Sequence, residues 1–151
     1  MGDSNVLGML GAGLVMGISG LGAAVGMGIA GSASIGAWKR CYKANKPAPM
    51  TLLAFIGFPL TEVFYGFILM MQMIGAMEAG VSLDKSGLYL GMGIASGLGI
   101  AFVGVAEGWI GAAAADSLTD TGKGFANYVA AMGICETVAL FVMVLSMLYI
   151  N

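Results

Sequence analysis

The sequence predicts an all-α integral membrane protein with four transmembrane helices. Hydrophobic residues make up 59% of the 151 residues and charged residues only 9%, and the mean hydropathy is +0.94. Soluble globular domains carry about 25% charged residues, so a soluble domain of this size could not cover its surface with so few. The charges also fall in clusters, and each apolar run between them exceeds the roughly 20 residues that a helix needs to cross a bilayer. A soluble helical bundle would need a polar face on each helix, and none is visible.

The first predicted helix covers the uncharged residues 6–38 and contains ten glycines. A basic loop follows it, with four of the six basic residues of the chain: Lys39, Arg40, Lys43 and Lys46. This excess of positive charge places the loop in the cytoplasm. Trp38 and Tyr42 flank the loop, where interfacial aromatic side chains are expected.

The second predicted helix, residues 51–77, is apolar apart from Glu62. Pro59 inside it cannot donate a backbone hydrogen bond, and its ring disturbs one turn, which can aim a backbone carbonyl sideways. The third predicted helix, residues 87–115, contains eight glycines and is apolar apart from Glu107.

The fourth predicted helix, residues 125–150, is apolar apart from Glu136. Because successive spans alternate in direction, we expect both termini outside the cell membrane and the loops within the two hairpins in the cytoplasm. The chain is then one membrane domain, residues 1–151, made of two hairpins at 6–77 and 87–150. The opening MGDSNV has no basic stretch, so we expect no cleaved secretory signal.

The two predicted hairpins resemble each other. A shift of 80 positions brings Gly13 onto Gly93, and a shift of 76 positions brings Thr61 onto Thr137. Both hairpins enter and leave the membrane on the same sides. The sequence therefore predicts a parallel duplication.

Side-chain size separates the helices into two kinds. The first and third are rich in glycine, whereas residues 51–77 hold three glycines and residues 125–150 hold one. Small residues four positions apart let helix backbones approach closely, and the glycines of the first helix cover several of its faces. We therefore predict a two-layered ring, with thin helices inside and bulky helices outside. The glycines expected to pack there are Gly20, Gly22, Gly26, Gly28 and Gly31.

The composition excludes several functions. The chain has no histidine, which removes His-based acid–base catalysis and His metal sites. The net charge is −2, and no basic patch indicates a nucleic-acid partner. Cys41 and Cys135 cannot form a disulfide framework and are interpreted as free thiols.

Three acidic residues lie inside predicted spans, although a charge at the bilayer centre costs about 2.5–3.5 kcal/mol. Glu62 and Glu136 lie about 16 Å, and Glu107 about 12 Å, from the same side of the membrane at 1.5 Å per residue. Carboxylates at one depth, with the hydroxyl of Thr61 beside them, favour a hard cation, which prefers oxygen ligands. Three ionised groups would overcharge a site for one monovalent ion, so we expect at least one to be protonated. A protonated acid that only packs is the alternative for Glu62 or Glu107.

Three segments carry a resemblance to a known family: GLGAAVGMGIAG (Gly20–Gly31), FPLTEVFYGF (Phe58–Phe67) and ICETVALF (Ile134–Phe141). Together with the predicted duplicated hairpins, they resemble the membrane rotor proteolipid of V-type ATPases, and most of all the bacterial K subunit. The resemblance implies a homo-oligomeric ring in lipid whose copies each carry one ion past a stator subunit. It also implies central-stalk subunits as partners and no ATP hydrolysis by this chain.

The resemblance assigns roles to single residues. Glu136 matches the essential glutamate of the fourth helix, Thr61 matches a threonine ligand, and Phe58 matches the residue that offers a backbone carbonyl. Glu62 and Glu107 stand where sodium-binding relatives typically carry glutamines. The resulting prediction is Na⁺ transport with the ion at Glu136, Glu107, Glu62 and Thr61, and H⁺ in the same rotor role is the alternative.

Other functions compete with this interpretation. A small secondary cation transporter could also be a four-helix protein with an essential acid, but such transporters often use inverted repeats, and the repeat here is parallel. A membrane hydrolase would need a nucleophile–base pair, and Cys135 beside Glu136 is a weak case. Three buried acids argue against a purely structural pore.

Overall fold

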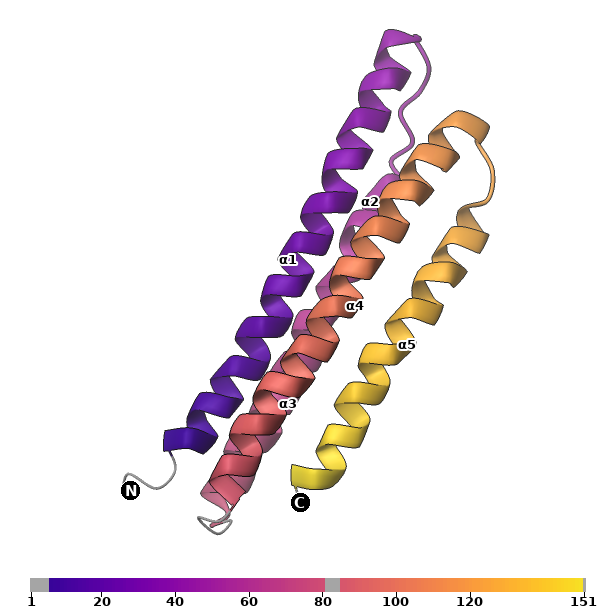
Figure 1. The fold of residues 1–151 in the computed structure, drawn as a ribbon. Helices are drawn as coiled ribbons and strands as arrows, with labels where there is room; N and C mark the ends of the chain where they lie inside the picture. Colours follow the sequence, from indigo (N-terminus) through magenta and orange to yellow (C-terminus); the bar gives the residue numbers. More distant parts are fainter. Residues whose placement is uncertain (1–5, 81–84, 151) are drawn as a thin grey trace.

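The computed structural model describes residues 6–80 and 85–150, and all regular secondary structure in these ranges is helical. The helices are α1 (Val6–Lys43), α2 (Leu52–Gly57), α3 (Thr61–Glu78), α4 (Ser86–Thr121) and α5 (Phe125–Ile150), with a 3₁₀ turn η2 (Phe58–Leu60) between α2 and α3. Four segments are long and apolar enough to span a membrane (Figure 1), if α2, η2 and α3 are counted together. The predicted fold class of four apolar helices is confirmed.

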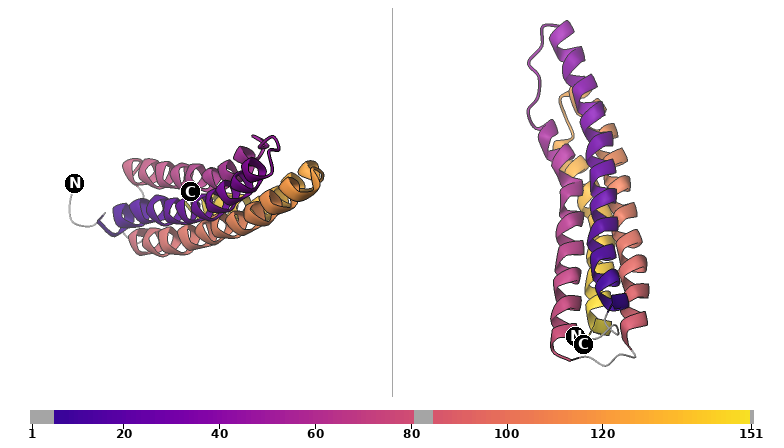
Figure 2. Two further views of the ribbon diagram at one scale, coloured as in Figure 1. Left: turned by 90° about the horizontal axis from the view of Figure 1, so that it is seen from above. Right: turned by 90° about the vertical axis from the view of Figure 1, so that its left-hand side faces the viewer.

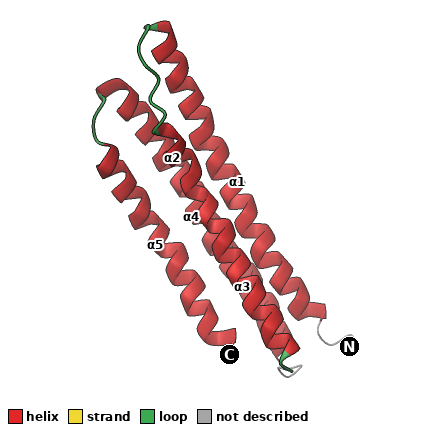
Figure 3. Cartoon of the chain, turned by 180° about the vertical axis from the view of Figure 1, so that it is seen from behind, coloured by secondary structure: helices red, strands yellow, loops and turns green. Residues whose placement is uncertain are grey.

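α1 and α4 are longer than the sequence analysis predicted. α1 continues beyond residue 38 to Lys43, and α4 continues beyond residue 115 to Thr121. Outside the hydrocarbon, charged residues do not have to end a helix. The basic side chains in the last turn of α1 also stabilise the helix, because they interact favourably with the negative end of its dipole. α4 ends where Gly122 adopts a φ of 67° and donates its N–H to the carbonyl of Leu118. Both helices therefore extend past α2 and α5 at the end of the bundle where the described loops lie (Figure 3).

Pro59 interrupts the second span, as the sequence predicts. The backbone tightens into the 3₁₀ turn η2, and the N–H of Thr61 bonds to the carbonyl of Phe58. α3 then starts at Thr61. The turn therefore sets the direction in which the first residues of α3 point, including Glu62.

The bundle has two layers. α1 and α4 lie side by side as one layer (Figure 2), and the other layer consists of the segment from α2 to α3, which packs mainly on α1, and of α5, which packs mainly on α4. Glycines allow the backbones of α1 and α4 to pack closely. A β-carbon on Gly26 would overlap the carbonyl oxygen of Gly104, and one on Gly93 would overlap the carbonyl oxygen of Gly11. The close backbone approach that small residues permit thus occurs inside one chain, between α1 and α4.

Two clusters of buried side chains hold the layers together. One gathers Val15, Leu69, Tyr89 and Ile100 among others toward the end where both chain termini lie. The other gathers Leu52, Phe55, Ala115 and Met132 among others toward the end with the described loops. The candidate site described below lies between the two.

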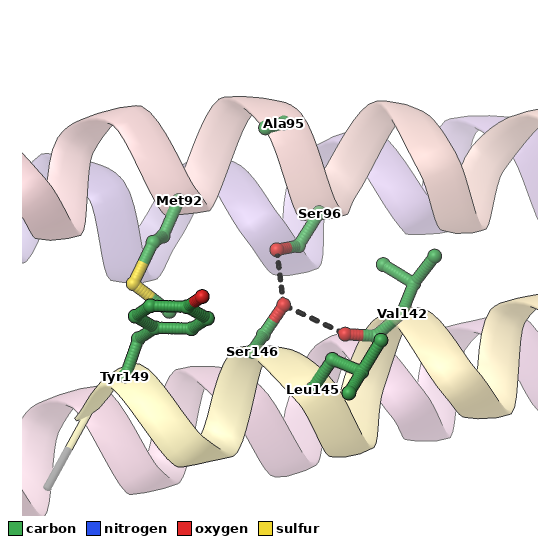
Figure 4. Close-up of a pocket in the computed structure, with 7 residues that line it drawn as sticks. All are labelled: Met92, Ala95, Ser96, Val142, Leu145, Ser146 and Tyr149. Carbon is green, nitrogen blue, oxygen red and sulfur yellow. Dashed lines mark hydrogen bonds between the residues drawn. The ribbon is translucent and has the colours of Figure 1, made fainter.

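Polar contacts tie the helices at both ends. At the loop end, Arg40 of α1 pairs with Asp116 of α4 and lies 3.8 Å from Asp120. At the other end, the hydroxyls of Ser96 in α4 and Ser146 in α5 are 2.7 Å apart, and both residues line a groove of about 320 Å³ (Figure 4).

α5 is the least covered helix. Its outer face exposes a row of large apolar side chains: Ile134, Val138, Phe141, Leu145 and Leu148. In water such a face would be unfavourable, but hydrocarbon is as apolar as these side chains. The exposure fits a helix that faces lipid or another protein inside a membrane.

Candidate functional site

Two carboxyl groups are enclosed at the middle of the bundle. Glu62 of α3 and Glu107 of α4 are both 0% exposed. None of their four carboxyl oxygens has a hydrogen-bond partner among the described residues. Glu62 packs beside α4, since a β-carbon on Gly104 would lie 3.1 Å from its Cγ. Buried polar groups are normally hydrogen-bonded, so this pair indicates a place where a ligand or proton is handled.

The third carboxyl group has a partner. Glu136 of α5 is partly exposed, and the hydroxyl of Tyr65 in α3 donates a hydrogen bond of 2.8 Å to its Oε1. Tyr65 lies three residues after Glu62, so both side chains share one face of α3. All three carboxyl groups are near enough for their charges to interact. The structure therefore brings Glu62, Glu107 and Glu136 into one region of the bundle, and their shared depth in the membrane remains a prediction.

Two further predicted ligands contact each other. The hydroxyl of Thr61 donates a hydrogen bond of 2.9 Å to the carbonyl oxygen of Phe58. Both belong to the turn at Pro59, so the proline places a hydroxyl and a carbonyl oxygen just before Glu62 in the chain. Either oxygen has lone pairs left for a cation.

The site includes a residue that the sequence analysis missed. The sequence does not predict Tyr65 as a ligand, because a tyrosine in an apolar span is typical of ordinary packing. Its spacing from Glu62 was the available signal, since a hydroxyl three residues from a buried acid lies on the same face of the helix.

The predicted packing glycines fall into two groups. Gly22 and Gly26 contact the backbone of α4. Gly20 and Gly28 have no neighbour within 4 Å that a β-carbon would meet, and Gly31 would meet only the side chain of Ile56, at 3.9 Å. Packing at Gly20, Gly28 and Gly31 therefore remains a prediction about contacts outside a single chain.

A ready-made metal cluster does not occur in residues 6–80 and 85–150: no three acidic or cysteine side chains there are grouped to hold one ion. Direct ligation of one cation by Glu62, Glu107 and Glu136 together would require the three carboxyl groups to move closer. Na⁺ at these residues and at Thr61 remains a prediction.

The chain matches known proteins in sequence. Residues 90–149, which include most of α4 and α5, match the family of the ATP synthase C subunit. The chain is also 32% identical to the A-type ATP synthase subunit K of Methanocaldococcus jannaschii in an alignment of 112 residues. The match covers 67% of this chain and 49% of that protein. Both matches support a place for the chain among the c/K-type proteolipids of V/A-type ATPases. This proteolipid spans about half the length of the curated relative that it matches.

Two of the three acids lie in the segment that matches the family. Glu107 and Glu136 both fall inside residues 90–149, whereas Glu62 lies outside. The match covers the second predicted hairpin, so the duplication of the first hairpin stays a prediction. The long apolar helices and the family together make this proteolipid a multi-pass membrane protein.

Proposed function

We propose that this proteolipid is the ion-carrying subunit of the rotor ring in the membrane sector of a V-type ATPase, with Glu136 as the carrying carboxylate. One observation carries the proposal. Glu136 is the partly exposed member of the three acids, and its side chain accepts a hydrogen bond from a neutral group, the hydroxyl of Tyr65. A carboxylate at mid-membrane depth with an open side can exchange its ion at a protein surface. The enclosed Glu62 and Glu107 have no such access.

Na⁺ is the ion that we propose. The site offers more oxygens than proton transfer requires, since the hydroxyl of Thr61 and the carbonyl of Phe58 accompany the acids. Each buried acid costs insertion energy, so surplus acids are best explained by ligation. With the ion bound, Glu136 is ionised and faces the cation, and Glu62 or Glu107 is protonated and donates to a neighbouring oxygen.

The partners follow from the rotor role. Identical copies form the ring in lipid, a stator membrane subunit exchanges ions with Glu136, and proteins of the central stalk link the ring to ATP hydrolysis elsewhere in the complex. The loops at residues 44–51 and 122–124 face the cytoplasm and both termini face outward. This orientation is supported by the basic residues around the first loop and by the two termini at one end of the bundle (Figure 1).

A carbodiimide tests the site and the ion in one experiment. The reagent attacks protonated carboxyls in apolar surroundings, and peptide mass spectrometry locates the labelled residue. We expect labelling at Glu136 with loss of ATP-driven transport, and protection by Na⁺ at neutral pH that weakens as the pH falls. Glu136→Gln should abolish transport while the complex still assembles.

The outcomes separate the alternatives. Normal transport by Glu136→Gln would refute the carrying role. Labelling that follows pH alone and ignores Na⁺ up to molar concentrations would mean a proton rotor, in which Glu62 and Glu107 hold Glu136 protonated. A particle of twice 15.3 kDa in native mass spectrometry, instead of a ring, would favour a small secondary transporter.

A further inference from the structure

A cavity of about 470 Å³ lies at the end of the bundle where the described loops are found (Figure 3). Its lining comes from the last turn of α1, the loop at residues 44–51, the end of α4 and the first residue of α5. A second cavity of about 210 Å³ adjoins it, since Cys41, Lys46 and Thr119 line both. None of the three acids lines either cavity, so this place is separate from the candidate ion site.

The larger cavity lies at the level where two membrane spans begin. Phe125, which lines it, is the first residue of α5, and Thr51, which also lines it, directly precedes α2. The indole N–H of Trp38 donates a hydrogen bond of 2.9 Å to the carbonyl of Pro49, another lining residue. Tryptophan is enriched at the boundary between membrane and water. The cavity therefore lies at the depth of the lipid headgroups.

The lining of the larger cavity combines apolar walls with one cation. Pro47, Leu118 and Phe125 supply apolar walls. Lys46 is the one charged residue among the described residues that line this cavity. Within residues 6–80 and 85–150, its ammonium group takes part in no ion pair. A ligand that fits this lining has an apolar part and an anionic part.

The charges around the cavity favour an anion. Residues 38–51 and 116–124 hold five basic and two acidic residues, a net charge of +3. The two acids, Asp116 and Asp120, both lie beside Arg40, so they do not neutralise Lys46. Basic groups at the cytoplasmic surface of a membrane are attracted to anionic lipids, and basic pockets between helices on that side bind lipid headgroups.

We infer that the larger cavity binds an anionic phospholipid, with the phosphate at Lys46 and an acyl chain against Pro47, Leu118 and Phe125. A phospholipid satisfies both kinds of lining, because covering apolar walls with alkyl carbons is favourable and the charged head stays beside the ammonium group. A free phosphate ion would leave the apolar walls uncovered. The inference goes beyond the proposed rotor role and does not depend on the ion carried. It uses only the orientation proposed above, in which this end faces the cytoplasm.

Native mass spectrometry of the purified chain, titrated with phosphatidylglycerol or phosphatidylcholine in mild detergent, tests the site. We expect the tightest phosphatidylglycerol of each copy to bind more strongly than phosphatidylcholine. Lys46→Gln should weaken its binding about fivefold, the effect of one basic residue near a membrane surface. The matched control Lys123→Gln removes the same charge at the same end, but Lys123 lines neither cavity, so binding should be unchanged. Equal weakening by both variants, or equal binding of the two lipids, would overturn the inference.

The thiol of Cys41, which lines both cavities, reports on their occupation while Lys46 is kept. In a Cys135→Ala background, phosphatidylglycerol should slow the reaction of this thiol with methyl methanethiosulfonate, whereas phosphatidylcholine and inorganic phosphate should not. Protection by inorganic phosphate alone would indicate a site for free anions and would overturn the inference. Protection in the assembled complex but not by phosphatidylglycerol would assign the cavity to a protein partner and overturn it as well.

A substitution that fills the cavities gives an independent readout. Thr119→Trp adds bulk to the wall that both cavities share, so the chain should keep its helix content and lose the tightly bound phosphatidylglycerol. Thr121→Trp is the matched control, since Thr121 is exposed and lines neither cavity, and it should retain the lipid. Undiminished binding of phosphatidylglycerol by folded Thr119→Trp would contradict the inference.

Discussion

The hydrogen bond between Tyr65 and Glu136 gives a prediction about the reactivity of the site. Tyr65→Phe removes one hydroxyl and leaves the ring in place, so the packing between α3 and α5 is kept. The hydroxyl donates a hydrogen bond to Oε1 of Glu136 at 2.8 Å, and this bond must be broken before that oxygen can react with a carbodiimide. A hydrogen bond to a charged group contributes about 1.5–3 kcal/mol, so its loss should lower the barrier to this reaction by a similar amount.

Converted at about 1.4 kcal/mol for each factor of ten, this predicts that Glu136 reacts with a carbodiimide roughly 10- to 150-fold faster. The measurement is the labelling rate in Na⁺-free membranes at one pH, followed by mass spectrometry of the peptide that contains Glu136. Tyr89→Phe is the matched control, because its hydroxyl donates to the carbonyl of Ile150 and its loss should leave the rate unchanged. Equal rates for Tyr65→Phe and the unmodified protein would refute the reasoning.

Two further predictions concern packing and ion ligation. Gly26→Ala places a β-carbon against the carbonyl oxygen of Gly104, and overpacking of this kind costs about 1–3 kcal/mol. In detergent with increasing dodecyl sulfate, this variant should unfold at a lower dodecyl sulfate concentration than the unmodified chain, whereas Gly36→Ala should behave like the unmodified chain. Thr61→Val removes the hydroxyl that donates to the Phe58 carbonyl and is expected to weaken Na⁺ protection of Glu136 without preventing its labelling. Full Na⁺ protection in Thr61→Val would remove Thr61 from the ligand set.

The helices and the three acids could be predicted from the sequence because a bilayer imposes strong constraints. A span must be long and apolar, so each break in hydropathy marks a loop, and an acid inside a span stands out. The ends of α1 and α4 could not be placed, since their last turns lie among charged residues where hydropathy gives no signal. Helix propensity and the glycine cap at Gly122 decide those ends.

The role of Tyr65 and the division among the glycines depended on information that the sequence does not contain. Tyr65 and Glu136 are 71 residues apart, and their hydrogen bond depends on how α3 and α5 are rotated relative to each other. Gly26 and Gly28 look alike in sequence, yet only Gly26 lies on the side of α1 that α4 occupies. Which side that is depends on packing between helices that are far apart along the chain.

The sparse attachment of α5 has a consequence for the kinetics of the site. Buried residues are few along this helix, and polar bonds from Tyr65, Tyr89 and Ser96 supplement its packing. Local opening in proteins is easiest where few buried contacts must be broken. Small excursions of α5 therefore require less free energy than separation of α1 from α4. Access to Glu136 can then fluctuate while the glycine-packed layer stays closed, which separates the rate of ion exchange from the stability of the bundle.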